Sequence, residues 1–256
     1  MVLAGVGGWL VQALPDITSN LIAAAIGGVL VWSATNARRR FSLAGARRFW
    51  RAVGGRHPLI VLGAHDFGPR RRWARAGVVG MGDIGALVEI EAQLRKLGRT
   101  GKILESRQLP PADLSADLVL IGGPLANTVT ATMLAKLGEV ISYGFAEDPD
   151  HAAAVVRDLK SGRALAPQYD EPGYPVSDYA LIIRAPNPLA PETSELVIVA
   201  GCFEHGTAAA AETLGERKFL RMVRKLKHFE ALVETTVVNG THYHTEVVEI
   251  RRIPAG

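Results

Sequence analysis

The chain has 256 residues, of which 48% are hydrophobic and 21% are charged. This composition excludes an intrinsically disordered chain, and the length fits one domain with an appendage better than two full domains. A single cysteine, Cys202, excludes an internal disulfide framework and a zinc site built from several cysteines.

The net charge of +4 is unevenly distributed along the chain. Residues 38–75 hold eleven arginines and one acidic residue, Asp66, whereas residues 76–256 hold 18 lysines and arginines against 23 acidic residues. Basic residues beside an apolar segment usually determine topology and contact anionic headgroups. Because the rest of the chain is net negative, we do not expect nucleic acid as a partner.

An uncharged segment of 21 residues runs from Ile17 to Ala37. As a helix it would be roughly 30 Å long, which matches the hydrocarbon core of a bilayer. Trp32 lies near one end, and arginines follow the segment directly. This pattern predicts a transmembrane helix with the following residues in the cytosol.

We therefore expect a single-pass protein of the cell inner membrane with a cytoplasmic C-terminal domain. The predicted parts are a membrane segment (residues 1–37), a basic juxtamembrane linker (38–56) and a cytosolic domain (57–256). A helix packed against protein is the alternative for the first part. Small residues at positions 23, 27 and 28 would allow close helix pairing, and hence a homo-oligomer.

Short apolar runs alternate with amphipathic segments after residue 57. Leu59–Gly63 predicts a buried strand, and Asp83 is a suitable N-cap for a helix over Ile84–Leu97. Lys102–Glu105 predicts a second strand. This succession is typical of βα units.

The same succession occurs twice more. Asp117–Ile121 predicts a strand that is broken by Gly122-Gly123-Pro124 and followed by a helix from about Ala126 to Leu137. Glu195–Ala200 predicts another strand, followed by a loop over residues 201–207 and a helix from Ala208 to Leu214. Such loops can direct backbone N–H groups at an anion.

Two antiparallel hairpins complete the expected fold. Arg163–Tyr169 and Tyr179–Ala185 form a candidate pair, and Leu232–Val238 and His242–Ile250 flank Asn239-Gly240, a favoured two-residue turn. The predicted fold class is α/β, with a Rossmann-like, mostly parallel sheet and added antiparallel hairpins, preceded by one N-terminal transmembrane helix.

Glycine-bearing loops at strand ends predict where a ligand binds, because open α/β sheets bind ligands at the carboxyl ends of their strands. The predicted ligand-binding residues come from three loops: Gly82, Asp83, Gly122, Gly123, Asn127, Gly206 and Thr207. In the alternative interpretation these are tight turns, with Asp83 and Asn127 capping their own helices. Asp178 precedes an apolar strand and could border the same cleft.

The stretch from Gly201 to Glu212 resembles the Gly-Gly-x-Gly-Thr-x-x-Glu signature of LOG-like Rossmann proteins. The whole arrangement is also similar to membrane-tethered, SLOG-type Rossmann-like domains of bacterial conflict and signalling systems. This resemblance implies nucleotide binding and, in some members, cleavage of a base from ribose. Glu212 departs from the signature because it follows Thr207 by five residues instead of three.

We therefore expect a membrane-anchored sensor or effector of a nucleotide-like small molecule, acting in bacterial defence signalling. The first alternative is a glycosidase-type hydrolase acting on a nucleotide or NAD, with Glu212, Glu204 or Asp83 as the carboxylate. The second is a non-catalytic structural or interaction protein. The sequence identifies no cofactor.

Two further groups of residues give weaker indications of a catalytic or metal site. Cys202 and His205 share a loop and could form a thiolate pair, although a lone cysteine after a strand is more often a buried residue. His242 and His244 alternate along a strand, but no third zinc ligand accompanies them, so we predict no metal site.

Overall fold

The computed structural model describes residues 44–51, 53, 57–65, 77–148 and 153–254. The chain divides into two compact units, Met1–Ala44 and Gly45–Gly256, and the second unit contains all the helices and strands named below. The predicted membrane helix at residues 17–37 and most of the basic linker lie outside the described residues. Within the described ranges, no helix is long and apolar enough to span a bilayer. The predicted domain boundaries at residues 37 and 56 stay predictions.

A seven-stranded mixed sheet forms the centre of the second unit, in the order β10-β9-β7-β8-β3-β1-β2. Strands β8, β3, β1 and β2 are parallel to one another, whereas β7 is antiparallel to both β8 and β9, and β10 is antiparallel to β9. The strands are β1 (Leu59–Leu62), β2 (Lys102–Glu105), β3 (Leu118–Ile121), β7 (Ser177–Pro186), β8 (Glu195–Gly201), β9 (Phe229–Val238) and β10 (Thr241–Arg252).

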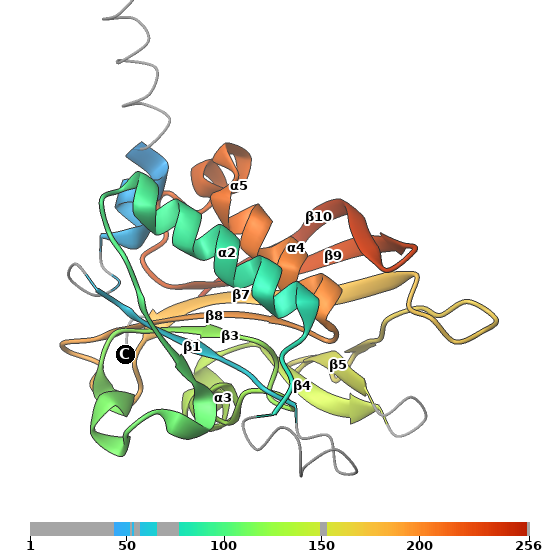
Figure 1. The fold of residues 1–256 in the computed structure, drawn as a ribbon, viewed down its shortest axis with the longest axis horizontal. Helices are drawn as coiled ribbons and strands as arrows, with labels where there is room; N and C mark the ends of the chain where they lie inside the picture. The colour runs from blue at the N-terminus through green and yellow to red at the C-terminus, as the bar shows by residue number, and fades with distance from the viewer. Residues whose placement is uncertain (1–43, 52, 54–56, 66–76, 149–152, 255–256) are drawn as a thin grey trace, which may run out of the picture. The chain divides into compact units, whose positions relative to one another are not determined.

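Three helices cover one face of this sheet: α2 (Met81–Lys96), α4 (Glu204–Gly215) and α5 (Arg217–Met222) (Figure 1). A helical stretch at residues 44–50 adds Phe49 and Trp50 to the same core. Alternate residues of β1, β3, β7, β8 and β9 point to this face and are buried there, among them Ile60, Ile121, Ile182 and Val199. The periodicity of two that strands impose therefore places half of their apolar residues in this core.

The other face carries α3 (Thr128–Leu137) and a second sheet. The remaining strand residues are buried there, among them Val61, Leu120, Ile183 and Ile198. Both faces of β1, β3 and β8 are covered, which explains why these strands are continuous apolar runs in the sequence. Short 3₁₀ helices, η2 (Ser106–Gln108), η3 (Pro111–Ser115) and η4 (Gly138–Val140), connect neighbouring elements.

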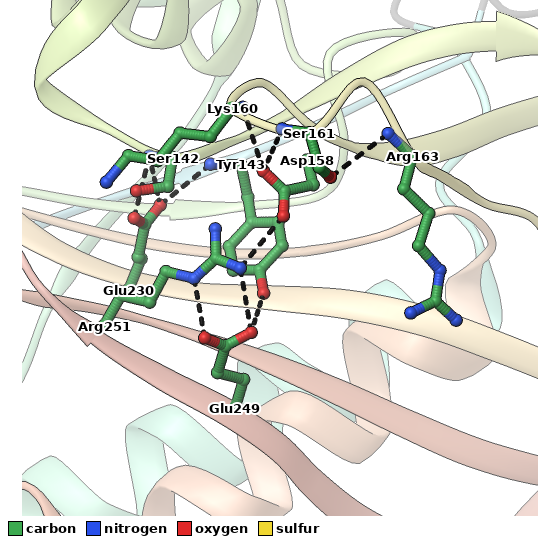
Figure 2. A network of polar contacts seen from close by, with 9 residues as sticks. All are labelled: Ser142, Tyr143, Asp158, Lys160, Ser161, Arg163, Glu230, Glu249 and Arg251. Carbon is green, nitrogen blue, oxygen red and sulfur yellow. Dashed lines mark hydrogen bonds and ion pairs between the residues drawn. The ribbon is translucent and has the colours of Figure 1, made fainter.

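The second sheet has the order β4-β5-β6 and is antiparallel throughout. It consists of β4 (Tyr143–Asp148), β5 (Ala153–Asp158) and β6 (Ala164–Leu165). A buried carboxylate fixes it to the main sheet: Glu230 on β9 accepts the backbone N–H groups of Ser142 at 2.7 Å and of Tyr143 at 3.0 Å (Figure 2).

Arg251 on β10 makes a second link between the two sheets. Its guanidinium donates to Asp158 at 2.9 Å and to Glu249 at 2.8 and 2.9 Å, and lies 4.3 Å from the centre of the Tyr143 ring (Figure 2). The Tyr143 hydroxyl donates to Glu249 at 2.6 Å. Charge-assisted bonds to Arg251 hold the pKa values of Asp158 and Glu249 below their usual range.

The C-terminal hairpin is confirmed, because β9 and β10 pair around Asn239 (φ 50°) and Gly240 (φ 72°). Two consecutive positive φ angles are what a type I′ turn requires. The other predicted hairpin is wrong. Strand β6 pairs with β5, and β7 lies between β8 and β9, where both of its faces are buried.

The predicted fold class is also wrong. The sheet is mixed rather than mostly parallel, and a separate antiparallel sheet lies beside it. The physical reason lies in the connections: only the short segment 187–194 joins β7 to β8, whereas a parallel crossover needs about a dozen residues or more. An apolar run reveals a buried strand but not its direction.

Candidate functional site

A cleft of about 710 Å³ opens at the carboxyl ends of β1, β3 and β8. This volume lies within the usual range for small-molecule sites. Chain order reverses between β1 and β3, since β2 flanks β1 on one side and β3 flanks it on the other. The cleft therefore lies where open α/β sheets bind ligands. Its described lining consists of His65, Val78, Val79, Gly80, Met81, Asp83, Gly123, Leu125, Ala126, Ala154, Pro175, Gly201, Cys202, Phe203, Glu204, His205 and Thr207.

The first turns of α2 and α4 pack closely and bring two carboxylates together. The Gly82 N–H donates to the Glu204 carboxylate at 3.0 Å. A Cβ atom at Gly82 would lie 2.2 Å from the Glu204 carbonyl oxygen, so only glycine fits there. A Cβ at Gly80 would lie 2.5 Å from Glu204 Oε2 and 3.4 Å from Asp83 Oδ2, so both carboxylates face the same point on the backbone.

Asp83 is the most perturbed carboxylate in the lining. Its side chain is buried, and burial raises its pKa to about 6; a hydrogen bond from Thr207 opposes this shift, and the nearby charge of Glu204 adds to it. Gly80 is the N-cap of α2, so Asp83 lies in the first helical turn and is not the cap that the sequence predicts. Burial lowers the pKa of His205, which therefore favours its neutral form.

Asp178, at the start of β7, is fully buried behind the loop that leads into α4. Its carboxylate accepts the backbone N–H groups of Phe203 at 3.1 Å and of Gly206 at 2.5 Å, and thereby caps α4. Burial raises its pKa to about 8, against the effect of these N–H groups. The amide of Gly206, which the sequence assigns to a ligand, is thus bound within the protein.

The Gly122–Asn127 loop is held by similar internal bonds. Asn127 is fully buried; its amide donates to the carbonyl oxygens of Val61 and Ile121 at 3.0 Å each, and its oxygen accepts from Val129 N at 3.0 Å and Thr130 N at 3.1 Å. Its hydrogen-bonding capacity is therefore used in capping α3 and joining β1 to β3.

The contacts of Gly122 and Thr207 show where these two predicted loop residues lie relative to the cleft. Gly122 adopts φ +98° and lies near Asp83, because a Cβ there would be 3.6 Å from Asp83 Oδ2. Thr207 lines the cleft, and its hydroxyl accepts the Gly201 N–H at 3.0 Å. Three of the predicted ligand-binding residues line the cleft, namely Asp83, Gly123 and Thr207. The other four, Gly82, Gly122, Asn127 and Gly206, are not part of its lining but make the contacts that hold the surrounding loops.

The other residues that the sequence suggests for catalysis or metal binding are not arranged for these roles. Glu212 is outside the cleft lining and lies 3.2 Å from His242 Nε2. Cys202 does line the cleft, but burial raises the pKa of its thiol well above the usual value, which disfavours a thiolate. Within the described part of the chain, no group of three or more histidine, cysteine or acidic side chains is arranged to hold a metal ion.

The apolar wall of the cleft could not be predicted from a sequence motif. Met81, Leu125 and Val78 remain 78%, 50% and 42% exposed, respectively, although each is a large apolar residue. Ala154 comes from the second sheet and Pro175 from the loop before β7. Only the folded chain brings these segments together, and an exposed apolar surface next to polar groups is typical of binding sites.

A comparison with family models finds a match to the S-layer like family, outer domain, over residues 109–217. This range is less than half of the chain; it includes β3, α3, the second sheet, β7, β8 and α4, but neither α2 nor β9 and β10. No curated protein matches the chain. The predicted resemblance to SLOG and LOG proteins is therefore wrong, and this similarity instead associates the chain with the cell envelope.

Proposed function

We propose that the cleft binds a small molecule that combines an apolar body with ammonium or hydroxyl groups. The observation that carries this proposal is the pairing of Asp83 with Glu204 on an otherwise largely apolar lining. Carboxylates accept hydrogen bonds from hydroxyls and attract cations, and both effects increase where water is excluded. The apolar wall would pack against the body of the ligand.

The same chemistry argues against the nucleotide that the sequence predicts. The described lining has two carboxylates and neither lysine nor arginine. A phosphate there would meet like charges, and the Gly206 amide is already bound to Asp178. The predictions of nucleotide binding and of a role in antiviral defence thus have no support from the fold or from the family match.

The test compares three ligands that share one aromatic ring, using the purified full-length chain and titration calorimetry. Phenethylamine presents an ammonium group, phenyl glucoside presents hydroxyls and phenyl phosphate presents an anion; AMP tests the nucleotide directly. We expect the first two to bind and the last two not to bind. Tighter binding of phenyl phosphate or AMP would contradict the proposal.

One pair of variants assigns binding to the cleft. Glu204→Gln keeps an oxygen that can accept the Gly82 N–H and removes the charge. We expect it to weaken phenethylamine binding by about tenfold or more, the equivalent of about 1.4 kcal/mol. Glu212→Gln is the matched control, because it removes a carboxylate from the same helix outside the cleft. Equal effects of both variants would place binding elsewhere.

A hydrolase is the second candidate, and the raised pKa of Asp83 beside Glu204 favours it. A carboxyl group with a pKa of about 6 can donate a proton near neutral pH. Of the three carboxylates named from the sequence, the cleft thus retains Asp83 and Glu204. Release of methanol from a panel of methyl glycosides, whose leaving oxygen must be protonated, would support this candidate if it is lost in Asp83→Asn. Undiminished release by Asp83→Asn would exclude Asp83 as the acid.

The family match favours a third candidate, a structural role at the cell surface. Its test is self-assembly: regular arrays of the purified chain in electron micrographs would support it, and a monodisperse monomer would not. The finer location, an inner-membrane protein with a cytoplasmic C-terminal domain, stays a prediction. Protease treatment of intact cells distinguishes it from display outside the membrane, since only a displayed domain would be cleaved.

A further inference from the structure

A second, smaller pocket of about 190 Å³ lies near one end of the main sheet. The cleft that holds Asp83 and Glu204, called the acidic cleft below, lies at the opposite end. Arg184 marks the end with the pocket: it lies near the carboxyl end of β7 and is paired with Val197 near the start of β8, whereas the acidic cleft lies beyond the end of β8. Residues 45–49, the end of α5 and the segment leading into β9 form the rest of the pocket wall.

The described lining of this pocket carries five cationic side chains and no carboxylate: Arg48, Arg184, Arg224, Lys225 and Lys227. Four apolar residues, Phe49, Leu220, Val223 and Leu226, line the remainder together with Gly45. Glu195 partly offsets the charge of Arg184, but the other four like charges around so small a volume repel one another, so a bound anion would stabilise the arrangement.

Arg184 is the fixed element of the pocket. It is 6% exposed, its guanidinium lies 5.2 Å from the centre of the Phe49 ring, and its Nε lies 3.5 Å from Glu195. Glu195 also lies 3.1 Å from His228 Nε2 and is therefore shared. A buried arginine held by an aromatic ring and one carboxylate is preorganised, which reduces the entropy lost when it binds a ligand.

The other four cations are exposed and lack ion-pair partners within the described residues. Surface lysines and arginines with acidic neighbours are usually neutralised locally, whereas Arg48, Arg224, Lys225 and Lys227 converge on one cavity whose described lining holds no carboxylate. The arrangement offers several N–H donors to a compact oxyanion.

We propose that this pocket binds a phosphate group. Arginine and lysine together suit phosphate, because the guanidinium bonds two oxygens at once and the ammonium groups add charge. A volume of about 190 Å³ admits a phosphate with a small substituent and is below the usual size of sites for drug-sized ligands. The phosphate comes either from a soluble ester or from the headgroup of an anionic lipid.

The test measures binding of inorganic phosphate and glycerol 3-phosphate to the full-length chain by titration calorimetry. The variant Arg224→Gln/Lys225→Gln/Lys227→Gln removes three exposed charges from the pocket. Its matched control is Arg217→Gln/Lys218→Gln/Arg221→Gln, which removes three exposed charges from α5 outside the pocket lining. We expect at least about tenfold weaker phosphate binding in the first variant and less than about twofold change in the second.

Three results would overturn the proposal: no phosphate binding by the unmodified chain, no loss in the pocket variant, or equal loss in both variants. Equal loss would indicate attraction by net charge without a site. Arg184→Lys adds a second check, because it keeps the positive charge but removes the planar guanidinium that can bond two phosphate oxygens at once. We expect weaker phosphate binding by this variant. Unchanged binding would contradict the assignment of Arg184.

The source of the phosphate is decided by sedimentation with vesicles. Binding to phosphatidylglycerol vesicles but not to phosphatidylcholine vesicles, lost in the pocket variant, assigns a lipid headgroup. Phosphate and glycerol 3-phosphate binding without vesicle binding assigns a soluble ester. Both outcomes support the phosphate site, and neither depends on the ligand of the acidic cleft.

Discussion

The variant Asp83→Asn should be more stable than the unmodified chain, and this gain in stability should be larger at neutral pH than at acidic pH. The folded state raises the pKa of Asp83 to about 6, from 3.8 for an unperturbed aspartate. Below about pH 3.8 the group is protonated in both states, and its contribution to stability is fully present. As the pH rises through 6, the folded state must hold a charge that the unfolded state carries freely, so stability is lost. At about 1.4 kcal/mol per pKa unit the loss is ~3 kcal/mol.

The assay is urea unfolding of both proteins between about pH 3 and pH 7.5. Asparagine is nearly isosteric with aspartate and does not titrate, so the free energy of unfolding of Asp83→Asn should rise by ~3 kcal/mol relative to the unmodified chain across this range. Asp178, whose pKa is also raised, titrates in both proteins and cancels in the difference. Glu192→Gln, at an exposed carboxylate, controls for loss of charge. Parallel pH curves for Asp83→Asn and the unmodified chain would refute the reasoning.

Three further variants test the internal network. Asn127→Ala should lower the free energy of unfolding by roughly 2–4 kcal/mol in urea titrations, because it removes a helix cap and two buried hydrogen bonds to the carbonyl oxygens of Val61 and Ile121; a loss below about 0.5 kcal/mol would contradict that role. Glu230→Gln should cost roughly 1–3 kcal/mol in the same assay, since an amide NH₂ would face the N–H groups of Ser142 or Tyr143. Arg251→Gln should flatten the loss of stability below about pH 4: the lowered pKa values of Asp158 and Glu249 give stability that is present above their usual range and lost as the pH falls. An acid limb as steep in Arg251→Gln as in the unmodified chain would show that the pairing contributes nothing.

The sequence predicts the strands that carry the cleft because their residues determine their structure locally. The apolar runs at β1, β3 and β8 and the glycines that follow them mark both the strands and the loops at their carboxyl ends. Strands β4 and β5 were not predicted, although Tyr143 and Val156 are buried in the core. Both segments are short, and they pair with each other instead of with the main sheet.

The roles of the site residues depend on contacts between distant segments. Asp178 caps α4 from 25 and 28 residues away along the chain, so no local pattern assigns it that role. Glu204 approaches Asp83 only because glycines let the first turns of α2 and α4 pack closely. The loop amides were predicted to bind an anion, but a carboxylate of the protein itself binds one of them, and this changes the expected charge of the ligand.

The most direct test of the proposed cleft is the pKa of Asp83 itself, measured by carbon NMR of the side-chain carboxyl groups with and without phenethylamine. Asp83→Asn assigns the resonance. We predict a pKa of about 6 in the free protein and a lower value in the presence of phenethylamine, since a cation beside the carboxylate favours its ionised form. A pKa near 3.8 in the free protein, or one that phenethylamine leaves unchanged, would contradict the assignment of Asp83 to a cation-binding cleft.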